Sequence, residues 1–166
     1  MKSEKNSREM IEALEKIFIK NNLKPLTVLD LGCGKFPYLS LFGKQTKINL
    51  WDINFNIVLH KKIEKNPNLH FSFVNLNEIN KLPEVDLVIS SLVFHFLRSE
   101  RLKILMKEIE KSSFFLLVEF EEKKINENLL TNFNLLDFVS FETPLEKHDG
   151  LPEHKHQIII RLFSHK

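Results

Sequence analysis

Five short apolar runs, separated by polar or helical segments, constrain the fold of this sequence more than any other feature. Gly, Pro, Asn or charged residues bound each run, and the runs lie at residues 26–31, 47–52, 70–74, 85–90 and 113–119. Runs of this length are typical of buried strands. Helical spacing follows over 57–63 and after Ser99, a suitable N-cap, whereas the connection 75–84 allows only a rudimentary helix. Strands that alternate with helices predict a parallel sheet with right-handed crossovers, the α/β class.

The two ends of the chain predict other elements. Apolar residues recur at helical spacing behind Ser7, a second suitable N-cap, which predicts an amphipathic helix over 7–21. Two strand-like segments, 135–142 and 156–163, flank the turn-rich stretch "ETPLEKHDGLPEHK" and predict an antiparallel pair joined by a long loop. With the five runs, this makes a mostly parallel seven-stranded sheet with an antiparallel C-terminal pair.

Length, charge and cysteine content limit the classes of protein. The 166 residues fit one domain, 1–166, with an N-terminal helix in 1–23 and a core in 24–166. A net charge of +2, from 24 basic and 22 acidic residues, neither indicates nor excludes nucleic acid, and no DNA partner is expected. A polar amino terminus and the lack of a long apolar run predict a cytoplasmic protein with no membrane partner. Cys33, the single cysteine, excludes an internal disulfide and a multi-cysteine zinc site.

The stretch "TVLDLGCGKFPYLS" places two glycines directly after the first strand, at the carboxyl end where open parallel sheets bind ligands. Glycine permits a sharp turn and close approach of a ligand to the backbone, although a simple tight turn explains Gly32 and Gly34 equally well in isolation. The second strand ends on Asp52, where an acid can accept hydrogen bonds from both ribose hydroxyls or be merely solvated. NAD and FAD are disfavoured, because Pro37 intrudes and Tyr38 or a neighbour occupies the third glycine position.

The segments "VLDLGCG" and "INLWDIN" resemble the S-adenosylmethionine binding motifs of Rossmann-like, class I methyltransferases. The resemblance covers roughly residues 26–120, and Phe36 stands where many members have a third glycine. It implies S-adenosyl-L-methionine as cofactor, with Asp30 contacting its methionine end directly or through the loop. The backbone of the glycine loop would lie against the methionine portion, and Asp52 would hold the ribose.

Two further segments extend the resemblance. "FVNLNEI" ends the third strand and implies Asn75 or Asn77 near the adenine, with Leu76 packing on its ring. "DLVISSLVFHFL" matches the fourth strand, with Asp86 at its start and its cofactor end at Ser90 to Leu92. The predicted cofactor-binding residues are Asp30, Gly32, Cys33, Gly34, Pro37, Asp52, Ile53, Asn54, Asn75, Leu76, Ser90, Ser91 and Leu92.

Methyl transfer from a sulfonium is an in-line displacement that depends chiefly on positioning, so the resemblance implies no universal catalytic residue. His95 follows the fourth strand on the predicted acceptor side, where it is either a base or orienting group, or a partly exposed turn residue. The Asn-Pro-Pro-aromatic motif of many amino-group methyltransferases is replaced by Ser90 to Val93, which makes those classes unfavourable. Carbon-5 pyrimidine methylation is also unfavourable, because Cys33 lies inside the cofactor loop.

Aromatic and histidine residues leave two alternatives open. Four aromatic residues either line a pocket for a flat acceptor or belong to the core: Phe36, Tyr38, Phe94 and Phe96. The segment His148-Asp149-Gly150 and the pair His154 and His156, with a carboxylate, raise the question of a metal site. Since no matching ligand cluster is evident elsewhere, the sequence favours a polar hairpin, and we predict no metal.

The sequence therefore predicts a methyltransferase whose acceptor, a small molecule or RNA, lies over the carboxyl edge of the sheet between the first helix, residues 36–42, His95 and residues 143–156. "DLGCGKFPYL" and "DLVISSLVFHFLRSERLKILMKEIEKS" also resemble, more weakly, the aminoglycoside-resistance methyltransferases that modify a guanine of small-subunit ribosomal RNA. Those proteins carry a large helical extension for ribosome docking, so RNA is the second choice of acceptor. Phe36 and the short 75–84 connection motivate a third hypothesis, an inactive methyltransferase-like binding or regulatory module.

Overall fold

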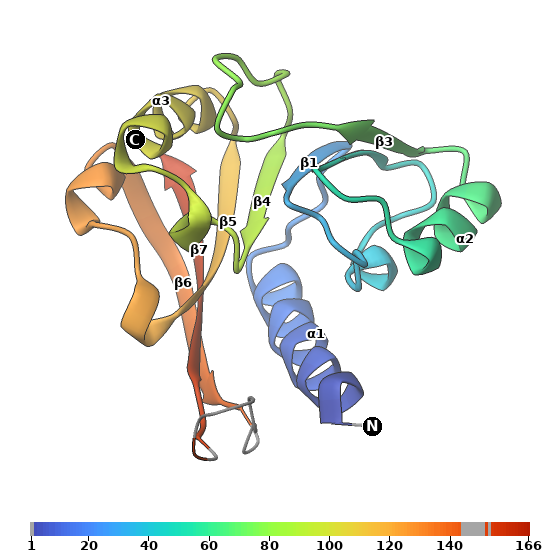
Figure 1. Cartoon of the computed structure of the whole chain (residues 1–166), viewed down its shortest axis with the longest axis horizontal. Coiled ribbons are helices and arrows are strands. Elements are labelled where there is room, and N and C mark those ends of the chain that lie inside the picture. Colours follow the sequence, from blue (N-terminus) through green and yellow to red (C-terminus); the bar gives the residue numbers. More distant parts are fainter. Residues whose placement is uncertain (1, 144–151, 153) are drawn as a thin grey trace.

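The chain folds around a twisted, mostly parallel sheet (Figure 1). The computed structural model describes residues 2–143, 152 and 154–166. Within these residues seven strands form one sheet, in the order β3-β2-β1-β4-β5-β7-β6. The strands are β1 (Thr27–Leu31), β2 (Lys47–Asp52), β3 (Leu69–Phe73), β4 (Leu87–Ser91), β5 (Phe114–Phe120), β6 (Phe133–Glu142) and β7 (Gln157–His165).

Strand directions confirm the fold class predicted from the sequence. Strands β1 to β5 pair in parallel, and β7 pairs antiparallel with both β5 and β6. A bulge between Leu135 and Asp137 interrupts the register of β6. The parallel strands bring their carboxyl ends to one edge of the sheet, where open α/β sheets bind ligands.

Helices cover both faces of the sheet. The α-helices are α1 (Lys2–Lys20), α2 (Ile57–Lys65) and α3 (Ser99–Ile109). Val28 packs in one core with Leu14 of α1 and Leu59 of α2, whereas its neighbour Leu29 packs in a second core with Leu105 of α3. Successive side chains of a strand point to opposite faces, so the central strands are buried on both sides and read as continuous apolar runs.

Two of the predicted helix starts are wrong. Helix α1 begins at Lys2, so Ser7 lies inside the helix, because lysine and glutamate extend a helix without an apolar stripe. Helix α3 includes Ser99 as its first residue and has Arg98 at the cap position, without a side-chain capping hydrogen bond. In the described part of the chain, no helix is both long and apolar enough to cross a membrane.

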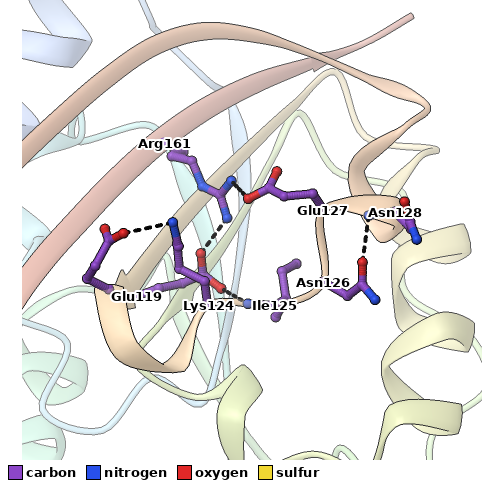
Figure 2. Close-up of polar contacts among 8 residues, drawn as sticks. Glu119, Lys124, Ile125, Asn126, Glu127, Asn128 and Arg161 are labelled. Atoms are coloured by element: carbon purple, nitrogen blue, oxygen red, sulfur yellow. Dashed lines mark hydrogen bonds and ion pairs between the residues drawn. The ribbon is translucent and has the colours of Figure 1, made fainter.

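A partly buried ion network fixes the segment that follows β5 (Figure 2). Arg161 of β7 donates to Glu119 of β5 at 2.6 Å and to Glu127 at 2.7 Å, and the side chains of Arg161 and Glu119 are both nearly buried. The second oxygen of Glu119 accepts from the backbone N–H of Ile125 at 2.8 Å. Burial raises the pKa of Glu119, against the opposing effect of these hydrogen bonds. The network holds the turn Glu121–Lys123 against the sheet, near the end of β5.

Candidate functional site

A pocket of about 440 Å³ lies at the carboxyl edge of the sheet. It is lined by residues that follow β1, β2, β3 and β4: Gly32, Asp52, Ile53, Asn54, Val74, Asn75, Leu76, Asn77, Val93, Phe96 and Leu97. A larger hollow of about 560 Å³ runs along α2 between aliphatic and lysine side chains and contains no predicted site residue. The pocket at the sheet edge is therefore the candidate functional site.

The pocket lining includes part of the predicted cofactor set and adds residues that the sequence analysis missed. Predicted residues that line it are Gly32, Asp52, Ile53, Asn54, Asn75 and Leu76, whereas Asp30, Cys33, Gly34, Pro37, Ser90, Ser91 and Leu92 are not in its lining. Val93, Phe96 and Leu97 form a wall that was not predicted as cofactor-binding. Only their position just after the fourth strand signals this role, because their residue types are those of ordinary core.

The two glycines of the loop have different structural roles. Gly32 has φ +73°, and its backbone N–H donates to the carbonyl of Trp51 at 2.7 Å. A Cβ at Gly32 would lie 2.3 Å from a methyl carbon of Val93, so only glycine fits between the loop and the segment after β4. Gly34 has φ +50°, and a Cβ there would meet nothing within 4 Å. The backbone at Gly34 is thus open to the approach of another molecule.

Phe36 has a backbone conformation that favours glycine. Its φ is +45°, in the left-handed region, while its side chain is fully buried. The ring stacks on Phe42 with centroids 6.1 Å apart and meets Tyr38 edge-on at 5.7 Å. From the other side, the ammonium of Lys62 donates to the carbonyl oxygens of Lys35 at 2.7 Å and Phe36 at 2.5 Å. Core packing and this lysine stabilise a turn that is otherwise unfavourable without glycine.

Asp52 is held at the rim of the pocket by two backbone amides. Its carboxylate accepts from the N–H of Gly34 at 2.9 Å and from the N–H of Asn54 at 3.0 Å. The acid after β2 is thereby tied to the glycine loop after β1. Each carboxylate oxygen keeps acceptor capacity beyond one hydrogen bond, so Asp52 can still receive a pair of hydroxyl donors.

Asp30 lies buried beneath the loop, with 0% of its surface exposed. Among the described residues, none donates a hydrogen bond to either of its carboxylate oxygens. Burial, and secondarily the charge of Asp52, raises the pKa of Asp30 from its ordinary 3.8 to about 8. A buried carboxyl without partners is costly, and such groups call for an explanation in function.

Other polar groups surround Asp30. Burial raises the pKa of Cys33, which keeps its thiol protonated and unsuited to act as a nucleophile. Tyr38 is buried, and burial and Asp30 raise its pKa. Ser90 is also fully buried, without a hydrogen-bond partner for its hydroxyl among the described residues.

His95 lies on the short helix Phe94–Phe96, just after β4. Its ring contacts Phe96, with centroids 4.0 Å apart, and lies 5.9 Å from the ring of Phe120. Burial and the nearby Lys123 lower its pKa below the ordinary 6.5. His95 is therefore mostly neutral at pH 7 and able to accept a proton.

The four aromatic residues singled out in the sequence divide between core and pocket. Phe36, Tyr38 and Phe94 are buried core residues, whereas Phe96 is 74% exposed and lines the pocket. The C-terminal loop cannot be placed in the same way, because His148, Asp149 and Gly150 lie outside the described residues.

Comparison with known proteins gives a family match and a fold match. Residues 5–116 match the family model described as "Tellurite resistance protein TehB". The chain is 33% identical over 95 residues to the Haemophilus influenzae protein named "Probable S-adenosyl-L-methionine-dependent methyltransferase TehB", and the match covers 54% of the chain and 32% of that protein. The chain thus spans about a third of the length of this curated relative.

Solved structures share the architecture. TehB from Haemophilus influenzae superposes with a TM-score of 0.71 at 23% identity, over 95% of this chain and 62% of that one. The Burkholderia thailandensis 1,6-didemethyltoxoflavin-N1-methyltransferase, solved with bound 1,6-didemethyltoxoflavin and S-adenosylhomocysteine, gives a TM-score of 0.65 at 13% identity, over 94% of this chain and 78% of that one. These matches confirm the Rossmann-like methyltransferase fold.

Proposed function

The chain belongs to the TehB family, and on that premise we propose that it binds S-adenosyl-L-methionine at the sheet-edge pocket and transfers its methyl group to a small acceptor. The observation that carries this proposal is a pocket whose rim carboxylate, Asp52, is tied to the open glycine backbone at Gly34, with the carboxyl of Asp30 buried nearby without a hydrogen-bond partner among the described residues. A class I cofactor needs a close backbone approach and an acid for its ribose. The residues present fit that group.

Different residues of the chain would bind different parts of the cofactor. Asp52, already oriented by two amides, would accept hydrogen bonds from the ribose hydroxyls. Asp30 would supply, when ionised, a buried negative charge to balance a cationic ligand group. Leu76, Val93 and Leu97 would provide apolar wall for a base ring. When bound, the cofactor supplies an electrophilic methyl group on a sulfonium.

His95 is the candidate to accept the proton that a methylated nitrogen or oxygen loses. Its lowered pKa leaves the imidazole neutral at pH 7, and it lies directly after β4 beside Phe120. The sequence prediction of His95 as the catalytic residue therefore stays a proposal. The single-domain organisation and the cytoplasmic location also stay predictions.

A small acceptor is favoured over RNA because the net charge of +2 gives no positive indication of a polyanionic partner. The family description makes tellurite the first small acceptor to test. Methyl transfer from labelled cofactor to this oxyanion, or to a panel of amines and phenols, would support the proposal. Salt-dependent binding to ribosomal subunits with label transfer to RNA would instead favour the guanine methyltransferase hypothesis.

Calorimetry with S-adenosylmethionine and S-adenosylhomocysteine tests the cofactor site directly. We expect Asp52→Ala to weaken binding by about 100-fold or more, because two charge-assisted hydrogen bonds contribute roughly 1.5 kcal/mol or more each. Glu84→Ala is the matched control, since Glu84 is an exposed acid just before β4, at the opposite end of that strand. Binding of neither compound to the wild type would overturn the proposal and leave the inactive module, whereas equal binding by Asp52→Ala would refute the ribose assignment.

A further inference from the structure

Two histidines and a glutamate meet beside the acceptor side of the sheet. Nε2 of His154 lies 3.0 Å from Nε2 of His156. Nδ1 of His156 lies 2.5 Å from a carboxylate oxygen of Glu122, and Nδ1 of His154 lies 3.0 Å from the carbonyl oxygen of Pro152. His156 is further fixed by its backbone, which exchanges hydrogen bonds with Thr143.

The outer partners determine how the two rings are protonated. A backbone carbonyl only accepts hydrogen bonds, so Nδ1 of His154 carries the proton in that contact. An ionised Glu122 likewise accepts from Nδ1 of His156. Nε2 of each ring then faces Nε2 of the other, and their 3.0 Å separation fits either a proton shared between the two rings or one cation bound to both.

We propose that His154 and His156 bind a divalent transition-metal ion through their Nε2 atoms, with Glu122 as the residue that orients His156. Metal-binding histidines usually donate their second ring N–H to a carboxylate or a backbone carbonyl, and each of these two partners is present here. This site goes beyond the proposed methyl transfer and does not depend on it.

The spacing of the two nitrogens selects among metals. Bonds of about 2.0–2.1 Å from both nitrogens to one ion would meet at about 90–95° for this separation. Such an angle suits the square or tetragonal geometry of Cu²⁺ and Ni²⁺ better than the tetrahedral angle of Zn²⁺. Cu²⁺ and Ni²⁺ are therefore the ions we expect to bind most tightly.

The described chain supplies two ligands only, because no group of three or more His, Cys, Asp or Glu side chains that could hold a metal occurs among the described residues. The ring of His156 lies 4.8 Å from that of Phe120, which also contacts His95. The ion would thus lie on the side of the sheet where we place the acceptor.

Metal titration of the whole purified chain tests this site, with Cu²⁺, Ni²⁺ and Zn²⁺ followed by calorimetry and Cu²⁺ by electron paramagnetic resonance. We expect one Cu²⁺ per chain with nitrogen hyperfine coupling, and tighter binding of Cu²⁺ and Ni²⁺ than of Zn²⁺. Glu122→Gln should weaken binding by about 10–100-fold. His154→Ala combined with His156→Ala should abolish it, while His60→Ala, a surface histidine of α2, serves as the control.

Three results would overturn the metal site. They are an absence of binding by the folded wild type, equal binding by the double variant and the wild type, or a resonance spectrum without nitrogen coupling. In the first case the two rings share a proton instead of an ion. Calorimetry with S-adenosylhomocysteine on the same samples keeps a failure of this inference separate from a failure of the proposed function.

Discussion

We expect the chain to lose stability as the pH rises from about 4 to about 8, because of the buried carboxyl of Asp30. Replacing Asp30 by asparagine should remove a large part of this loss. The carboxyl is fully buried, and burial together with Asp52 raises its pKa to about 8. Between pH 4 and pH 8 the folded chain therefore keeps a proton that the unfolded chain has lost. The contribution of Asp30 to stability is complete below pH 4 and is lost as the pH rises through the folded-state pKa.

The size of the effect follows from the pKa difference. A rise from 3.8 to about 8 corresponds to about 6 kcal/mol of unfolding free energy, at about 1.4 kcal/mol for each pH unit. Entry of water into the site would reduce this figure, so we expect a fall of about 2–5 kcal/mol. This is a substantial part of the roughly 5–15 kcal/mol that stabilises a typical domain.

Urea unfolding at a series of pH values between 4 and 9, for the wild type and for Asp30→Asn, measures the effect. The variant buries a neutral amide at every pH, so the comparison depends on the slopes of the two curves and not on their offset. Glu84→Gln, at an exposed acid, should leave the slope unchanged. Parallel curves for the wild type and Asp30→Asn would refute a buried carboxyl that titrates near pH 8.

Two further sets of substitutions test the glycine loop and the ion network. Gly32→Ala should cost about 2–4 kcal/mol of unfolding free energy, because the residue has a left-handed φ and its Cβ would clash with Val93. Gly34→Ala should cost only about 1 kcal/mol, and equal costs of the two variants in urea unfolding would contradict this assignment. Arg161→Met should cost about 3–5 kcal/mol because it leaves Glu119 buried without its cation, and adding Glu119→Gln should restore much of that loss. A double variant no more stable than Arg161→Met in thermal and urea unfolding would count against the network.

The sheet was predictable because its signal is local. Strands that are buried on both faces appear in the sequence as continuous apolar runs. Gly32 and Asp52 could be placed at one edge of the sheet because parallel strands end at the same edge. The helix starts were not predictable, since serines at 7 and 99 suit a cap position without requiring one. A cap depends on where the chain enters the helix, and that is decided by tertiary packing.

The candidate site was predictable only in part, for a similar reason. Motif residues mark the loop, the rim acid and the turn after β3, but the wall formed by Val93, Phe96 and Leu97 depends on how the segment after β4 lies against the loop. The pairing of His156 with Glu122 joins residues 34 apart in the sequence. No periodic pattern indicates such a contact.

Phe36 shows how the loop can hold a left-handed residue that carries a side chain. A left-handed residue with a side chain is strained, so it persists only where its surroundings determine the backbone. Here the ring is fully buried against Phe42 and Tyr38, and Lys62 binds the carbonyl oxygens of Lys35 and Phe36. Burial of the phenylalanine ring stabilises the fold by about 2 kcal/mol or more, which offsets the backbone strain that a glycine would avoid. The side chain of Phe36 is buried in the core, and the backbone at Gly34, which binds the rim carboxylate of Asp52, stays open as the cofactor proposal requires.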